Sequence, residues 1–277
     1  MKKASRSLKT NFLFVLFLLS IILVSCNSKE EGCLDIRASN FDFNADKPCE
    51  DCCTYPKLYF RMRHIWDDST AFRQSQVYTR AGVDTFKLID IDYAFSAFLI
   101  SDIEGLPESV EETIEIWCNE NGNIIEKEIV DDVIVINLTN LTYEIGTFRR
   151  DELFTTGEMT IGIPSSYDCA IADSLQSSAP LSAQSVIFHP DDMIRVFARV
   201  VLQKDTSRQV FDTLYIPNKE IQFNFDLNKD FKTGKPDTIY CTVSYQQWFR
   251  EINISTDEND LIIQQMSSNI PSGIEIE

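Results

Sequence analysis

Four cysteines crowd the segment from residue 32 to residue 56, and cysteine sulfur either forms disulfides or binds metal. They are Cys33, Cys49, Cys52 and Cys53, within GCLDIRASNFDFNADKPCEDCCTYP. Adjacent Cys52 and Cys53 cannot bond to one another without strain, so we expect Cys33 and Cys49 to take one each, in an order that stays open. A zinc site is the competing interpretation, but one CxxC falls short of the usual pair.

The same segment carries oxygen donors at alternate positions: Asn40, Asp42, Asn44 and Asp46. This two-residue spacing is typical of a looped calcium site, although the glycine and terminal glutamate of an EF-hand are missing. Asn and Asp also form tight turns by bonding their own backbone. The pattern therefore predicts either a calcium site or a series of turns.

Three further cysteines, Cys118, Cys169 and Cys241, lie beyond this segment. Cys118 and Cys241 are in phase with apolar neighbours and should face the core. A bond from Cys169 to either of them is compatible with the spacing. Leaving Cys26 aside, seven cysteines remain, so at least one is free or paired outside the chain.

The first 25 residues are typical of a secretory signal. Lys2, Lys3, Arg6 and Lys9 precede an uncharged run from Phe12 to Val24, too short to span a bilayer comfortably. The run ends in Leu-Val-Ser-Cys, which resembles a bacterial lipobox, and this resemblance implies cleavage before Cys26 and lipidation of its sulfur. Residues 26–31 would then form the tether of a lipoprotein. Its acidic residues resemble the export signal that sends some lipoproteins to the outer face of the outer membrane, and a merely solvated linker is the competing interpretation.

The composition is strongly acidic, with 43 Asp and Glu against 25 Lys and Arg, a net charge of −18. Removal of the signal takes away four basic residues and leaves 21, so the mature chain would carry about −22. Such a charge repels phosphate backbones and anionic lipid. We expect no nucleic-acid partner, and membrane attachment through acyl chains.

From residue 57 to residue 277 the hydrophobic period is two. In KLYFRMRH the residues Leu58, Phe60, Met62 and His64 share one face, and short strands of this kind recur between turns. Helical spacing is almost absent except at 260–268, a short helix or turn. The pattern predicts an all-β fold, a β-sandwich of antiparallel strands, behind a small disulfide-crosslinked module at 32–56.

Catalytic motifs are missing from the sequence. It has no GxSxG, HExxH, P-loop or GxGxxG, and no activated nucleophile stands out among two histidines and many carboxylates. We therefore expect a protein that is not an enzyme.

Two family resemblances follow from longer motifs. GCLDIRASNFDFNAD…CCTYP resembles short cysteine-containing repeats related to thrombospondin type 3 repeats, which occur as spacers in secreted bacterial proteins. The order of LYFRMRH, VYTRAGVDTFKLIDIDYAFSAFLI, IGTF, MTIGIP, HPDDM and SYQQWF resembles the copper-binding MbnP-like family of secreted β proteins.

The second resemblance implies a copper site at His64 and His189, in some members beside an oxidised tryptophan. Met193 is kept from the family pattern, but Arg195 stands where that pattern has its first Trp. A guanidinium cannot replace a ligand and opposes a nearby cation. Two histidines alone are also short of a full ligand set.

Two functions remain. The first is an accessory or structural subunit that docks onto an outer-membrane β-barrel complex for transport or protein assembly, alone or with other lipoproteins. The second is a metal- or ligand-binding surface lipoprotein, with His64, His189 and Met193 as candidate copper ligands and Asn40, Asp42, Asn44 and Asp46 as candidate calcium ligands.

Overall fold

The computed structural model of the chain describes residues 29–49, 51–80, 84–109, 112–131, 133–175, 179–182, 185–189, 191 and 194–277. The signal segment, the predicted lipidation site Cys26 and the predicted copper ligand Met193 lie outside the described residues. The chain divides into two compact units, one that ends at Thr54 and one that runs from Tyr55 to Glu277.

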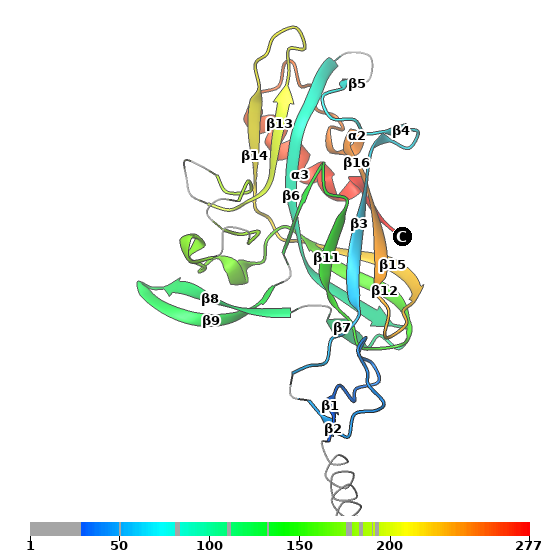
Figure 1. The fold of residues 1–277 in the computed structure, drawn as a ribbon. Coiled ribbons are helices and arrows are strands. Elements are labelled where there is room, and N and C mark those ends of the chain that lie inside the picture. The colour runs from blue at the N-terminus through cyan, green and yellow to red at the C-terminus, as the bar shows by residue number, and fades with distance from the viewer. Residues whose placement is uncertain are drawn as a thin grey trace, which may run out of the picture. The chain divides into compact units, whose positions relative to one another are not determined.

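The first unit contains very little regular structure. Its strands β1 (Glu31–Gly32) and β2 (Lys47–Pro48) pair in parallel over two residues (Figure 1). The apolar residues buried in its described part are Cys33 and Ala38. An interior of this size cannot hold a chain segment together without crosslinks, so the disulfides take the place of a core.

The larger sheet of the second unit has 8 strands in the order β14-β13-β6-β12-β15, and β10, β5 and β7 also pair with β6. All of these pairings are antiparallel. The bounds are β5 Val77–Arg80, β6 Asp84–Asp102, β7 Pro107–Ser109, β10 Ile134–Asn137, β12 Leu153–Ile161, β13 Val196–Gln203, β14 Asp212–Pro217 and β15 Ile221–Asp230. The long strand β6 therefore organises the whole sheet.

The smaller sheet has 5 strands in the order β11-β3-β16-β17, with β4 added to β3. Strands β3 and β16 run parallel, and the other pairs recorded in this sheet are antiparallel. The bounds are β3 Lys57–Asp67, β4 Thr70–Ala71, β11 Thr142–Thr147, β16 Asp237–Ser244 and β17 Ile274–Ile276. Two parallel strands need a long connection between them, and the connection from β3 to β16 includes most of the second unit.

The two sheets face each other across an aromatic core. Phe60 of β3 packs against Phe95 and Phe98 of β6, with ring centroids 6.1 and 5.3 Å apart. Leu58, Phe60 and Met62 are buried as their alternation predicts. The predicted all-β fold of antiparallel strands is confirmed.

A two-stranded ribbon, β8 (Glu112–Glu120) paired with β9 (Asn123–Asp131), forms a sheet of its own. The ribbon extends away from the two main sheets (Figure 1). Its inner residues Ile116, Cys118 and Ile129 join a second hydrophobic cluster with Ala94 of β6 and Tyr167. The central strand β6 is therefore covered on both faces.

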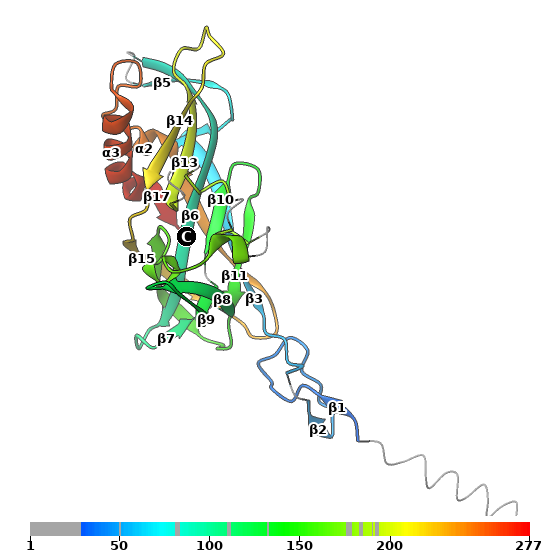
Figure 2. The same ribbon diagram turned by 90° about the vertical axis from the view of Figure 1, so that its left-hand side faces the viewer.

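Two helices close one side of the sandwich. Helix α2 (Tyr245–Trp248) follows β16 directly, and α3 (Asn259–Asn269) lies beside β14 (Figure 2). The segment 260–268, predicted as a short helix or turn, is thus a helix. Short 3-10 turns occur at Ser165–Tyr167, Ala172–Ser174 and Ile270–Gly273. Among the described residues no helix is long and apolar enough to cross a membrane.

Candidate functional site

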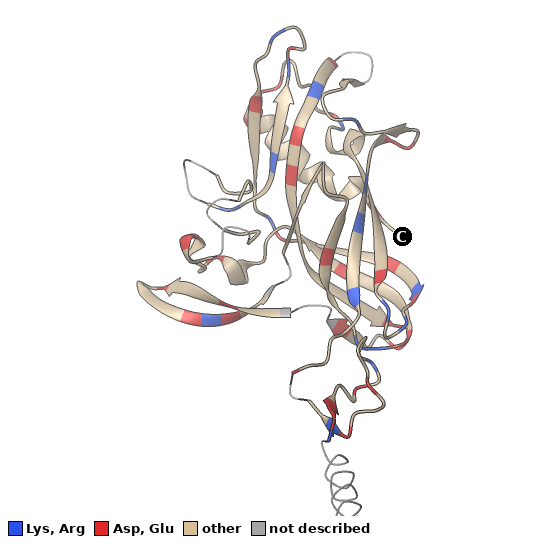
Figure 3. Cartoon of the chain, in the orientation of Figure 1, with Lys and Arg blue, Asp and Glu red and all other residues tan. Residues whose placement is uncertain are grey.

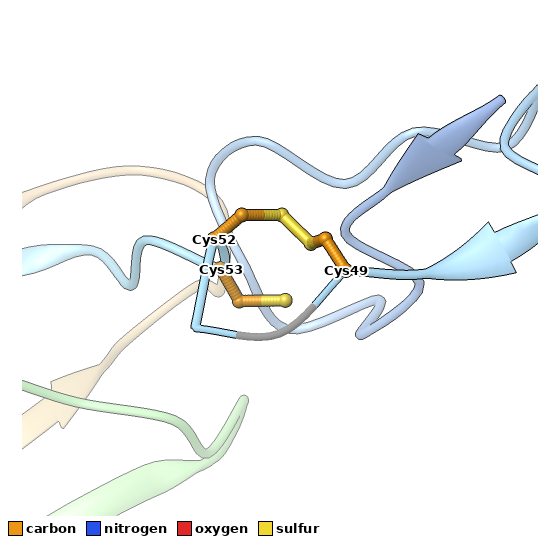
Figure 4. Close-up of side chains that lie close together, drawn as sticks. All are labelled: Cys49, Cys52 and Cys53. Carbon is orange, nitrogen blue, oxygen red and sulfur yellow. A yellow bond between two sulfur atoms is a disulfide. The ribbon is translucent and has the colours of Figure 1, made fainter.

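Three cysteine sulfurs lie close together in the N-terminal unit (Figure 4). Cys33 is bonded to Cys53 and Cys49 to Cys52, so each of the adjacent cysteines takes one partner, as their adjacency predicts. The sulfurs of Cys49, Cys52 and Cys53 lie within 4.8 Å of one another, the one group of three or more His, Cys, Asp or Glu donors found in the described part of the chain. Thiolates bind soft metals, so this group becomes a metal site only after reduction.

Three of the alternating Asn and Asp side chains, Asn40, Asp42 and Asp46, bond to the backbone of this unit. The Asn40 side chain accepts the Thr54 N–H at 2.8 Å and donates to the Cys52 carbonyl at 2.7 Å. Asp42 accepts the Asn44 N–H at 2.9 Å, and Asp46 accepts the Glu30 N–H at 3.3 Å. The Asp42 bond spans two residues, as in the local turns that Asn and Asp favour, whereas the Asn40 and Asp46 bonds join positions 12 to 16 residues apart. The calcium site at Asn40, Asp42, Asn44 and Asp46 therefore stays a prediction.

The remaining disulfide ties the ribbon to a neighbouring loop. Cys118 of β8 is bonded to Cys169, 51 residues further along the chain. Cys241 of β16 is free and fully buried, and burial raises the pKa of its thiol. The unpaired cysteine expected from the odd count is therefore a protonated core thiol, unsuited to pairing outside the chain.

His64 lies near the end of β3 and faces the core. Its Nδ1 lies 2.9 Å from the hydroxyl of Tyr245, and the two rings are stacked at 5.8 Å. Burial lowers the pKa of His64 to about 4, while the backbone of Asn137 acts in the opposite direction. The imidazole is therefore neutral at physiological pH, the form that binds metals, but one ring nitrogen is already engaged.

His189 lies in a different neighbourhood, against β14. Its Nδ1 accepts the backbone N–H of Asp191 at 3.3 Å, and its ring packs edge-on to Tyr215 at 4.5 Å. The ring lines a hollow of about 780 Å³ between β14 and α3, whose other lining residues include Lys219 and Asp260.

In the described part of the chain, His64 and His189 lie in separate surroundings. The contacts recorded for His64 and for His189 share no residue. Neither imidazole belongs to a group of three donors among the described residues. Copper needs more than a single imidazole, so these positions alone do not supply a ligand set.

Arg195, which replaces a tryptophan of the family motif, has a structural role. Its guanidinium donates to the carbonyls of Tyr167 and Ala170 at 2.8 and 3.1 Å, and burial lowers its pKa. These two carbonyls flank Cys169, so Arg195 fixes the loop that the disulfide ties to the ribbon.

An ion-pair cluster around Arg150 was not predicted from the sequence. Its guanidinium pairs with Asp102, Glu108 and Glu152 beside a hollow of about 310 Å³. The Leu106 amide, followed by Arg150, lowers the pKa of Asp102 to about 2. A carboxyl group with a pKa this low is ionised near neutral pH, so Asp102 itself cannot donate a proton there.

The outer face of the ribbon was also missed from the sequence. Trp117 of β8 is 46% exposed and Ile124 of β9 is 64% exposed, whereas the inner Ile116 and Cys118 are buried. The strict alternation along TIEIWC indicates one buried and one open face, but it cannot tell whether another element covers the second face.

Comparison with known proteins gives one structural likeness. No family model matches the chain, and no curated protein sequence matches it. Among solved structures, the chain is similar to "MbnP from Methylosinus trichosporium", with 11% sequence identity, a TM-score of 0.44, and coverage of 74% of this chain and 81% of that one. The match agrees with the resemblance in the sequence motifs and concerns the fold alone.

Proposed function

We propose that this chain is a non-enzymatic lipoprotein, anchored in the outer membrane through Cys26, that serves as an accessory or structural subunit of an outer-membrane β-barrel complex for transport or protein assembly. The observation that carries the proposal is the ribbon β8–β9, whose outer face exposes Trp117 and Ile124. Large apolar side chains on a projecting ribbon are typical of a contact surface.

Three further features support docking over catalysis. The ribbon is fixed at its base by a disulfide and by the buried Ile116 and Ile129, which lowers the entropy lost on binding. Asp102 is too acidic to act as a proton donor. His64 is largely buried, and its Nδ1 is engaged by the hydroxyl of Tyr245.

Two measurements on native material test the proposal. Mass spectrometry of the membrane-extracted protein should find a diacylglyceryl group on Cys26 and a chain that begins at that residue. Purification in mild detergent through a C-terminal tag should recover a β-barrel protein in stoichiometric amount. An unmodified Cys26 would contradict the lipid anchor. Recovery of the chain without a partner from membranes would contradict the subunit role.

Metal binding is the second candidate, and the three sulfurs of Cys49, Cys52 and Cys53 favour it. After reduction by a thiol, they could hold a soft cation such as copper(I) or zinc. Metal analysis should then find about one equivalent in reduced protein, and none in a Cys49→Ser, Cys52→Ser variant. Copper bound to the oxidised wild type would instead indicate a site at His64 or His189. Calcium bound to it would indicate a site in the Asn40–Asp46 loop.

A further inference from the structure

One edge of β9 is not paired with any described strand. On the other strand, the Ile171 N–H donates to the Trp117 carbonyl and the Asn119 N–H donates to the Cys169 carbonyl. Strand β8 is therefore flanked on both sides, by β9 and by the chain around Ala170. Strand β9 has a neighbour on one side only among the described strands.

The register identifies which residues of β9 present this edge. Because Trp117 and Asn119 bond away from β9, the alternate residues Ile116 and Cys118 bond toward it. Their partners are Lys127 and Ile125. The backbone N–H and C=O groups of Ile124, Glu126 and Glu128 consequently point outward, along the open edge.

The side chains around this edge are acidic. The described ribbon side chains include four carboxylates, at Glu115, Glu120, Glu126 and Glu128, and one cation, Lys127. Figure 3 shows red and blue segments along the ribbon. Lys127 is already paired with Glu120 at 3.3 Å. Glu115 lies directly across from Glu128, and like charges at such a position are unfavourable until a cation arrives.

The open backbone groups and the acidic side chains together indicate which kind of strand could pair with the edge of β9. A second copy of the chain would bring two rows of Glu126 and Glu128 together, which repel. A neutral strand would leave the carboxylates unpaired. A strand with basic side chains at alternate positions would satisfy both the backbone groups and the charges.

We infer that β9 accepts an extended basic segment of a partner protein as an added strand, paired with Ile124, Glu126 and Glu128. The inference rests on the proposed docking role and names the surface and the chemistry of the partner. Main-chain hydrogen bonds supply the affinity, and the alternating carboxylates select arginine or lysine.

The test uses the full chain and a synthetic seven-residue peptide that alternates arginine and valine. Trp66 and Trp248 are buried, so a fluorescence change on titration reports the exposed Trp117. Hydrogen exchange should show protection of the amides of residues 124, 126 and 128. A peptide with glutamate in place of arginine, or with alternate N-methylated amides, should bind at least about tenfold more weakly.

Two matched variants separate backbone pairing from charge. Glu126→Pro removes an outward N–H without breaking the β8–β9 ladder, and Glu126→Ala keeps that N–H. The proline variant should bind the peptide at least about tenfold more weakly than the alanine variant, since it loses a hydrogen bond and obstructs the edge. Equal binding of both, or unchanged binding of the N-methylated peptide, would overturn the added strand.

The outcomes also distinguish this inference from the docking role. If Glu126→Pro still recovers the native partner from detergent extracts, the subunit role stands and the β9 edge is the wrong surface. If the wild type binds the peptide but recovers no partner, the β9 edge can accept an added strand and the subunit role is contradicted.

Discussion

The hydroxyl of Tyr245 lies 2.9 Å from Nδ1 of His64, inside a core where both rings are stacked. The strand β3 and the helix α2 supply the two residues, which are 181 positions apart in the chain. His64, a candidate copper ligand on the family resemblance, is therefore a largely buried residue with a hydroxyl partner. This contact has a consequence for stability at acidic pH.

His64 should make the protein less stable as the pH falls from 6.5 to 4. Burial lowers its pKa from 6.5 to about 4, so in this window the unfolded chain binds a proton that the folded chain does not. The free energy of unfolding should fall by up to about 3 kcal/mol over this window because of this group. Urea denaturation at a series of pH values measures the loss.

The matched variant is His64→Gln, which keeps a polar group beside Tyr245 but does not titrate. Its stability should vary less with pH between 6.5 and 4 than that of the wild type. Parallel curves for the two proteins would mean that His64 is accessible to solvent and titrates normally.

Arg199 should stabilise the ionised form of Asp92 in the folded protein. Its guanidinium on β13 bonds to Asp90 and Asp92 on β6, with Nε 3.0 Å from Asp92, and burial otherwise raises the pKa of Asp92. Arg199→Met should lower the free energy of unfolding by about 2–4 kcal/mol at neutral pH, because it leaves a buried carboxylate without a cation.

A second substitution checks this cause. Asp92→Asn in the Arg199→Met background removes the stranded charge and should restore part of the loss. If the double variant is as unstable as the sum of the two single variants, packing and not charge explains the cost of replacing Arg199.

The Cys118–Cys169 disulfide should stabilise the chain more than Cys49–Cys52. The first closes a loop across 51 residues and the second across 3, so loop-closure entropy gives about 4 and about 2 kcal/mol as upper values. Calorimetry of the Cys118→Ala, Cys169→Ala variant and the Cys49→Ala, Cys52→Ala variant compares them. A larger loss in the second pair would contradict the entropic order.

Much of the fold could be predicted from the alternation of apolar and polar residues along the strands. Where a residue departs from this alternation, the cause is local. Leu58, Phe60 and Met62 of β3 are buried as predicted. On β6, Ile91, Tyr93 and Phe95 are also buried as predicted, but Ile89 of the same series is only half-buried. The pairing with β13 shifts register beside it, and such an irregularity changes the face of a side chain.

The sites were harder to predict than the strands. The sequence does not show that β6 carries cores on both faces, since Ala94 is too small to reveal a second cluster by periodicity. The strand β9 was not predicted from the sequence because Glu126, Lys127 and Glu128 interrupt its apolar residues. Pairing of Cys169 with Cys118 depends on a loop position that only tertiary structure fixes.

Photo-crosslinking in living cells tests the docking claim most directly. A photoreactive residue at position 124, on the outer face of the ribbon, should crosslink to a basic segment of a β-barrel protein or of its bound lipoprotein. The same residue at position 240, exposed on β16, should give no such product. Crosslinks from position 124 only to another copy of this chain, or equal products from both positions, would contradict the assignment of the ribbon as the docking surface.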